Sequence, residues 1–182
     1  MSKTKNIVLI AIFTALIAAG AFIKIAVPVV PFTLQFLFTT LAGLLLGARL
    51  GGISVICYIA LGLLGLPIFA GGGGPGYVLQ PTFGYLLGFA AGTWVTGKLA
   101  GQTANPSLKR LIAANFAGLL VVYAMGMVYY WAIYRFYIGT GIGLWTLFLY
   151  CFLLAVPGDL VLCILAAVLG KRLLPVLKKG RV

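Results

Sequence analysis

Six apolar runs determine what this chain can fold into. They cover residues 7–27, 32–47, 50–66, 81–99, 111–134 and 144–170, and most approach the roughly 20 residues that a helix needs to cross a bilayer. The chain is 63% hydrophobic and only 8% charged, whereas a soluble domain carries about 25% charged residues. We therefore expect an all-α integral membrane protein with six transmembrane helices in a single domain, residues 1–182. The first run leads into the next without a small-residue cleavage site, so we expect it to stay as a helix and not to be removed as a signal peptide.

The basic residues predict how these helices are oriented in the membrane. Eleven of the 13 basic residues fall at the two termini, in the links after the second and fourth runs, or at the end of the fourth run: Lys3, Lys5, Arg49, Lys98, Lys109, Arg110, Lys171, Arg172, Lys178, Lys179 and Arg181. Lys24 and Arg135 fall on the other side. Because cytoplasmic links are enriched in Lys and Arg, we expect both termini in the cytoplasm and the links 27–33, 67–80 and 135–143 outside. The net charge of +12 then reflects membrane topology and not binding to nucleic acid.

Asp159 is the only acidic residue, and it lies inside the last apolar run. Inserting a charged side chain near the centre of a membrane helix costs about 3 kcal/mol or more, so such residues usually face the bundle interior and mark functional sites. Pro157 lacks a backbone N–H and should break the helix just before Asp159. We expect Asp159 on the wall of a ligand pocket; the alternative is a structural carboxyl that is protonated or paired with a base.

Several chemistries have too few residues to support them. The chain has no histidine, and its three cysteines (Cys57, Cys151 and Cys163) lie in apolar runs without a C-x-x-C pair, so we expect no metal site and no His-based catalytic triad. The glycine-rich segment 71–76 lacks the Gly-Lys-Ser/Thr of a nucleotide-binding loop. It is interpreted as a mobile gate over a pocket or as a flexible connection. With no acid–base pair available, an enzyme is not expected.

A few other side chains are candidates for ligand or partner binding. The amides of Gln35 and Gln80 suit a polar uncharged group, and Lys24 could pair with a ligand carboxylate or a lipid phosphate. Two stripes of small residues permit close helix packing. One contains Ala11, Ala15 and Ala19 and serves either the bundle or a partner protein; the other contains Gly84, Gly88, Gly92, Thr96 and Ala100 and is expected to pack inside the bundle.

Four motifs in order resemble the biotin-specific S-components of energy-coupling-factor (ECF) transporters, the BioY family. They are Val-Pro-Phe-Thr-Leu-Gln at 30–35, Gly-Leu-Pro-Ile-Phe-Ala-Gly-Gly at 65–72, Gln-Pro-Thr-Phe-Gly-Tyr-Leu-Leu-Gly-Phe at 80–89 and Pro-Gly-Asp-Leu at 157–160. The resemblance implies an S-component-like bundle with cytoplasmic termini that captures biotin from outside. It also implies a transmembrane coupling protein and two cytoplasmic ATPase subunits as partners. No cofactor is implied, because biotin is the ligand and the partner subunits use the ATP.

The resemblance also suggests roles for the candidate residues. Asp159 and Gln80 would meet the ureido ring, an apolar lining would come from Phe32, Phe69, Tyr77 and Tyr85, and the carboxylate would meet Lys24 or backbone N–H groups around Gly72. The stripe of Ala11, Ala15 and Ala19 would contact the coupling protein. The alternative function is a stand-alone or proton-coupled carrier for a small carboxylated metabolite, although no second acid or histidine is present to form a proton relay.

Overall fold

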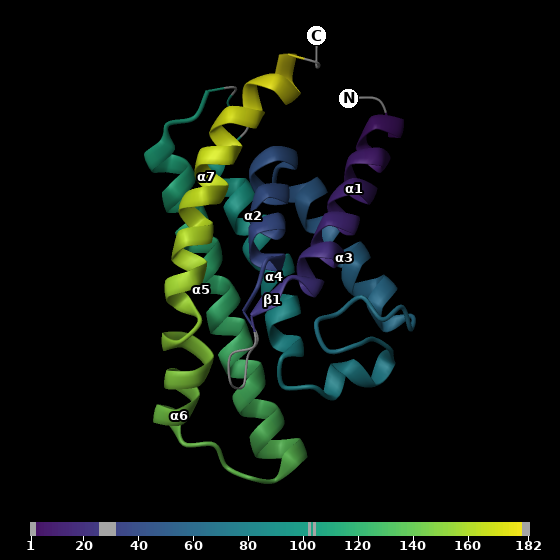
Figure 1. The fold of residues 1–182 in the computed structure, drawn as a ribbon, viewed down its shortest axis with the longest axis vertical. Coiled ribbons are helices and arrows are strands. Elements are labelled where there is room, and N and C mark those ends of the chain that lie inside the picture. Colours follow the sequence, from purple (N-terminus) through teal and green to yellow (C-terminus); the bar gives the residue numbers. More distant parts are fainter. Residues whose placement is uncertain (1–2, 26–31, 102, 104, 180–182) are drawn as a thin grey trace.

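The computed structural model describes residues 3–25, 32–101, 103 and 105–179. Within these ranges the chain crosses the bundle six times, as predicted from the apolar runs (Figure 1). The passes are α1 (Lys3–Phe22), α2 (Gln35–Leu46), α3 (Ala48–Leu63), α4 (Phe83–Ala100), α5 (Leu108–Ile133) and a final broken pass made of α6 (Leu144–Phe148) and α7 (Val156–Lys179). A π-helical turn, Tyr134–Ile138, extends α5.

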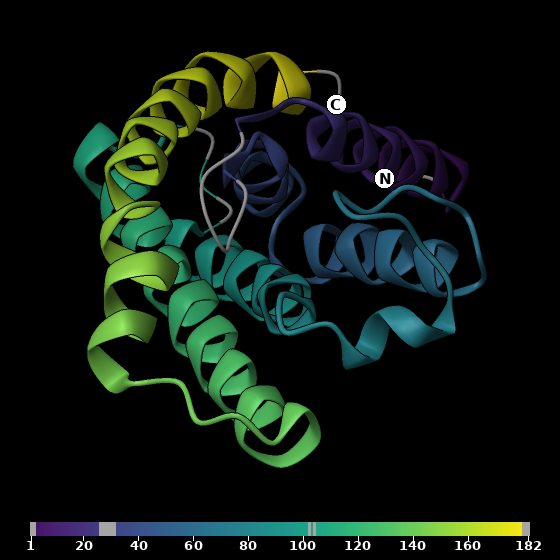
Figure 2. The same ribbon diagram turned by 60° about the horizontal axis from the view of Figure 1, so that its bottom comes forward.

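The shortest of the full passes, α2, forms the centre of the bundle. It contacts α1, α3, α4 and α7, and the others surround it when the molecule is viewed from its lower end (Figure 2). Its 12 residues span only about 18 Å at the rise of an α-helix, and all but Phe38 are buried. In the described part of the chain, three segments are long and apolar enough to cross a membrane: α1, α5 with its extension, and α6 through α7.

The small-residue stripe of α4 packs against α5, which confirms the predicted internal role. A Cβ atom on Gly88 would lie 2.8 Å from the carbonyl oxygen of Val122, and one on Gly92 would lie 2.7 Å from that of Gly118. Further along, the Thr96 hydroxyl donates to the carbonyl of Ala114 at 3.2 Å. Backbones therefore approach so closely here that larger side chains would separate the two helices.

The helix break predicted at Pro157 is present and begins several residues earlier. A π-helical turn covers Leu149–Leu153, where the N–H of Leu154 donates to the carbonyl of Leu149. A new helix, α7, then starts at Val156. Pro157 thus occupies the first turn of α7, where its missing N–H leaves no helical hydrogen bond unmade. The break places Asp159 in the first turn of a helix and not in the middle of one.

Two short structural features lie near the N-terminal end of α2. Strands β1 (Lys24–Ile25) and β2 (Phe32–Thr33) form an antiparallel hairpin in which Lys24 pairs with Thr33. The connection between α3 and α4 contains a 3-10 helix at Pro75–Leu79. The hairpin and this connection lie on the side of the bundle away from the two termini (Figure 1).

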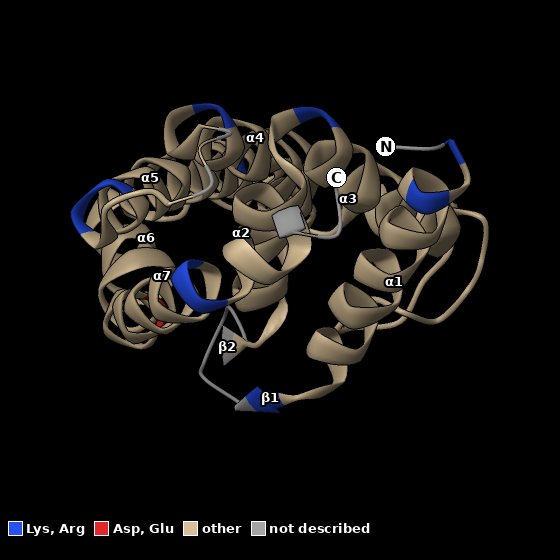
Figure 3. Cartoon of the chain, turned by 90° about the horizontal axis from the view of Figure 1, so that it is seen from above, with Lys and Arg blue, Asp and Glu red and all other residues tan. Residues whose placement is uncertain are grey.

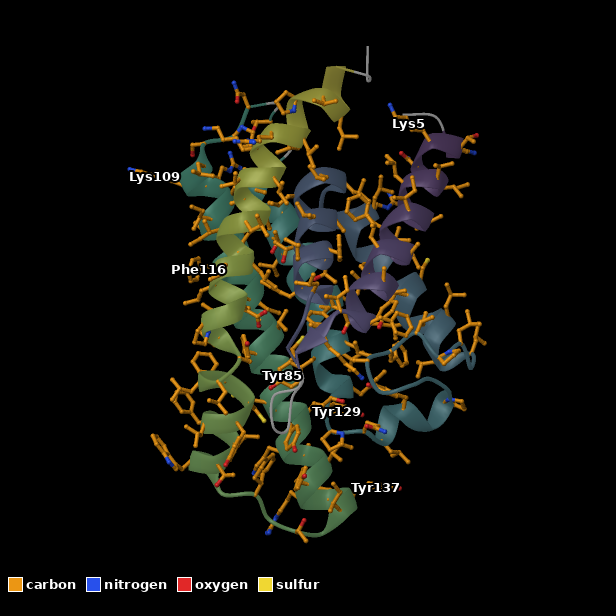
Figure 4. All side chains as sticks on the ribbon, in the orientation of Figure 1. Lys5, Tyr85, Lys109, Phe116, Tyr129 and Tyr137 are labelled. Carbon is orange, nitrogen blue, oxygen red and sulfur yellow. The ribbon has the colours of Figure 1, made fainter. Side chains whose placement is uncertain are left out.

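Charged residues are segregated along the length of the bundle. Viewed from the end that carries both termini, Lys and Arg ring the helix ends, and β1 carries a separate basic position (Figure 3). Lys5 and Lys109 lie at this end, Tyr85 lies midway, and Tyr137 lies at the opposite end (Figure 4). A basic end that carries both termini agrees with the positive-inside rule. The orientation of the chain in the membrane remains a prediction from that rule.

Candidate functional site

A cavity lies among α2, α4, α5 and α7 and is bordered by the α3–α4 connection. Its lining is mostly apolar and aromatic with a few polar groups, which is typical of small-molecule sites. The lining residues are Thr33, Gln35, Phe36, Ala70, Tyr77, Thr82, Tyr85, Leu86, Phe89, Val122, Tyr123, Ala155 and Asp159.

Asp159 and Tyr123 form the acidic wall of this cavity. The phenol of Tyr123 donates to Asp159 Oδ2 at 2.5 Å. The Tyr123 ring is held edge-on between Tyr85 and Phe152, with ring centroids 6.1 and 5.1 Å away. A carboxylate has about four acceptor positions, so Asp159 can accept further hydrogen bonds from a ligand while Tyr123 fixes its direction.

Tyr85 links the cavity to the broken pass. Its hydroxyl donates to the carbonyl of Cys151 at 2.9 Å, inside the π-helical turn where carbonyls lose their regular helical partners. The side chain that lines the cavity therefore also satisfies the backbone next to the helix break. A buried carbonyl left without such a donor would cost about 1–3 kcal/mol.

Gln35 forms a second polar wall, contributed by the first turn of α2. Its Oε1 accepts from the Thr33 hydroxyl at 3.2 Å, and its Nε2 donates to the Tyr58 hydroxyl at 2.6 Å. Tyr58 in turn donates to the carbonyl of Ile68 at 3.0 Å. Each end of an amide has capacity for a second hydrogen bond, so Gln35 can still donate to and accept from a ligand.

Side chains from three elements hold the α3–α4 connection beside the cavity. Tyr58 binds the carbonyl of Ile68, Lys24 Nζ donates to that of Ala70 at 2.9 Å, and Tyr129 donates to that of Val78. Because Ala70 lines the cavity, Lys24 lies just behind this part of the wall. The three bonded carbonyls lie on both sides of the glycine-rich segment 71–76, two before it and one after it.

The structure brings four of the predicted ligand-binding residues together in the cavity wall: Gln35, Tyr77, Tyr85 and Asp159. Lys24 does not line the cavity, but its Nζ donates to the carbonyl of Ala70, which does. The side chain of Phe32 lies outside the described part of the chain.

Phe69, Gly72 and Gln80 are not in the cavity wall. Phe69 is buried behind Tyr77, with ring centroids 4.6 Å apart, because the absence of a side chain at Gly62 leaves space for its ring. Gly72 exchanges backbone hydrogen bonds with Phe69. Gln80 is exposed at the end of the 3-10 helix, where only its backbone is engaged.

Sequence reasoning missed most of the apolar lining and, above all, Tyr123. Thr33 and Thr82 lie within the quoted motifs and could have been found from them. Tyr123 is one of nine tyrosines and lies in a long apolar run with no local signal. Only the packing of α5 against α7 reveals that it faces Asp159.

Fold and cavity together define a multi-pass membrane protein that holds a small-molecule site between its helices. The chain belongs to the BioY family, whose model matches residues 1–179.

Individual relatives agree with this assignment. A probable biotin transporter BioY of Lysinibacillus sphaericus is 44% identical over 179 residues, which covers 98% of this chain and 91% of the relative. A biotin transporter BioY of Rhizobium etli is 34% identical over 180 residues, covering 93% and 92%. The fold is similar to the 2.1 Å crystal structure of an S-component for biotin from an ECF-type ABC transporter, with a TM-score of 0.77, 29% identity and coverage of 95% of this chain and 94% of that one.

Proposed function

We propose that this chain is the biotin-binding S-component of an ECF-type vitamin uptake transporter in the cell membrane. Support comes from the family match over residues 1–179 and from a solved relative described as an S-component for biotin. The observation that carries the proposal is the cavity itself, which places Asp159 and Gln35 in one apolar and aromatic enclosure.

The chemistry of the cavity fits the two parts of biotin. The ureido ring has two N–H donors and one carbonyl, which complement the acceptor oxygens of Asp159 and the amide of Gln35. The sulfur-containing ring and the aliphatic chain fit against Tyr77, Tyr85 and the apolar lining. The carboxylate would meet Lys24 once its hydrogen bond to Ala70 opens, or backbone N–H groups near Gly72.

Transport requires partners that supply energy. In the proposed orientation both termini are cytoplasmic and biotin enters from outside. A transmembrane coupling protein would bind the stripe of Ala11, Ala15 and Ala19, which is exposed on α1, and two ATPase subunits would hydrolyse ATP. The chain acts by binding and delivery, not by catalysing a reaction.

Calorimetry of biotin binding to the detergent-purified chain tests the proposal, for the parent and for Asp159→Asn. The substitution keeps the shape of the side chain but removes its charge. We expect tight binding by the parent and a loss of about 10- to 100-fold in affinity, since hydrogen bonds to charged groups contribute about 1.5–3 kcal/mol. No binding by a folded parent would refute the biotin assignment. Parent-like affinity in Asp159→Asn would retain the function but make Asp159 structural.

A further inference from the structure

A second pocket lies at the end of the bundle that carries both termini, far from the acidic wall. It has a volume of about 360 Å³ and is formed by the turn between α2 and α3 together with the C-terminal end of α4. Its lining residues are Leu46, Gly47, Ala48, Arg49, Leu50, Gly97, Lys98 and Gly101.

Close backbone packing builds the floor of this pocket. A Cβ atom on Gly97 would overlap the backbone of Gly47 and Ala48, so α4 lies directly against the α2–α3 turn. Gly47 and Gly101 have backbone φ values of 84° and 72°, which residues that carry a side chain rarely adopt. The shape of the pocket therefore depends on rigid backbone contacts and not on mobile side chains.

The pocket gathers cations that have no side-chain carboxylate available to them. Arg49 and Lys98 line it, and Arg110 lies at its rim, where its Nε donates to the carbonyl of Leu99 and its guanidinium approaches Gly101. Asp159, the only acidic residue of the chain, lines the other cavity. Like charges held close together repel one another, so an anion from outside the chain would stabilise this arrangement.

An apolar surface continues from the cations along α4. Trp94 is 47% exposed, and Lys98 Nζ, from one helical turn further along α4, lies 4.7 Å from the centre of the Trp94 ring. A Lys beside an exposed Trp at a helix end is typical of the membrane interface. The surface thus presents positive charge at the helix end and apolar area immediately beside it.

We infer that this pocket binds the phosphate of an anionic phospholipid, with an acyl chain of that lipid along Trp94. Basic pockets between transmembrane helices are known to hold anionic lipid headgroups. An anionic headgroup matches three cations better than a zwitterionic one, and the apolar surface favours a lipid over a free anion. This lipid site is separate from the proposed biotin cavity and does not depend on it.

Native mass spectrometry of the purified full chain tests this site. The probes are phosphatidylglycerol and phosphatidylcholine with the same acyl chains, and inorganic phosphate as a competitor. The test variant is R49Q/K98Q, and the matched control is K171Q/R172Q, which also removes one Lys and one Arg but from an exposed part of α7. We expect R49Q/K98Q to retain phosphatidylglycerol about tenfold less than the parent, and the control to retain it like the parent. The thermal unfolding midpoint of both variants, compared with the parent, serves as the check of folding.

Five results would overturn the inference. Equal retention of phosphatidylglycerol by R49Q/K98Q and the parent would show that the pocket is not the site. Equal losses in both variants would indicate a general effect of charge, and equal retention of phosphatidylcholine would remove the preference for an anionic head. Complete displacement by millimolar inorganic phosphate would identify a free-anion site. If R49Q/K98Q kept the lipid but lost assembly with the coupling module, the cations would instead bind a protein carboxylate.

Discussion

At the scale of single residues, the position of Asp159 depends on a tyrosine from another helix. The Tyr123 hydroxyl donates to Asp159 Oδ2, and the Tyr123 ring is itself fixed between Tyr85 and Phe152. Such a contact orients the carboxylate before a ligand arrives, which lowers the cost of ordering it on binding. Tyr123 is thus expected to act on the ligand through Asp159.

Tyr123→Phe tests this role, because it removes the hydroxyl and keeps the ring. We expect biotin affinity to fall by about tenfold, the effect of losing one hydrogen bond to a charged group, as measured by calorimetry. Tyr137→Phe, at an exposed position in the extension of α5, is the matched control and should bind like the parent. Unchanged affinity in Tyr123→Phe would show that Asp159 does not need this partner.

How far the site could be predicted differs from residue to residue for physical reasons. Asp159 stood out because a lone acid in an apolar run is costly wherever it lies. Gln35 stood out as a polar group just inside a predicted helix. Phe69 was expected to line the ligand site, yet it fills the space beside Gly62. Which aromatic ring faces a cavity depends on its neighbours in space, and no local pattern carries that information.

At the scale of elements, the α3–α4 connection is shaped by a column of aromatic rings. Phe69 lies between Tyr58 and Tyr77, with ring centroids 5.4 and 4.6 Å away, and Tyr77 lines the cavity. Phe69 reaches this position only because Gly62 on α3 has no side chain: a Cβ there would overlap the Phe69 ring. The packing of Phe69 against Gly62 on α3 therefore determines the position of Tyr77 in the cavity wall.

Gly62→Ala should displace Phe69 and, through it, Tyr77. Overpacking of this kind destabilises a protein by about 1–3 kcal/mol, so we expect a lower thermal unfolding midpoint and biotin affinity reduced by about tenfold or more. Gly52→Ala is a control on the same helix, where a new Cβ would meet its nearest neighbour, Trp94 Cβ, at 4.0 Å. That variant should match the parent or gain slightly from helix propensity. Equal effects of the two substitutions would contradict the proposed coupling.

Hydropathy predicted the six passes but not their ends. The first run was expected to continue to Val27, yet α1 ends at Phe22 because Lys24 and Ile25 pair with β2. The second run was expected to cover 32–47, yet α2 covers only Gln35–Leu46, because Phe32 and Thr33 belong to β2 and Gly47 has a non-helical φ of 84°. Pro157 predicted a break before Asp159, and a break is present, but it begins at the π-helical turn Leu149–Leu153, where the sequence has no proline or glycine to mark it.

At the scale of the whole molecule, the chain presents separate surfaces for separate tasks. The cavity proposed to bind biotin lies inside the bundle, whereas Ala11, Ala15 and Ala19 are exposed on α1. Such a stripe of small residues in a membrane allows another helix to approach closely. Ligand capture and assembly with the coupling protein should therefore be separable by mutation.

Ala15→Trp tests that separation. The bulky ring would project from an exposed position on α1 and block close approach of a partner helix, while the interior of the bundle keeps its packing. We expect recovery of the complex with the coupling module to fall by about tenfold, since steric overpacking costs about 1–3 kcal/mol, and biotin uptake by cells to fall with it. Calorimetry on the isolated chain should give the parent's biotin affinity. Ala113→Trp, at an exposed position on α5, should assemble normally, and normal assembly of Ala15→Trp would exclude this face of α1 as the interface.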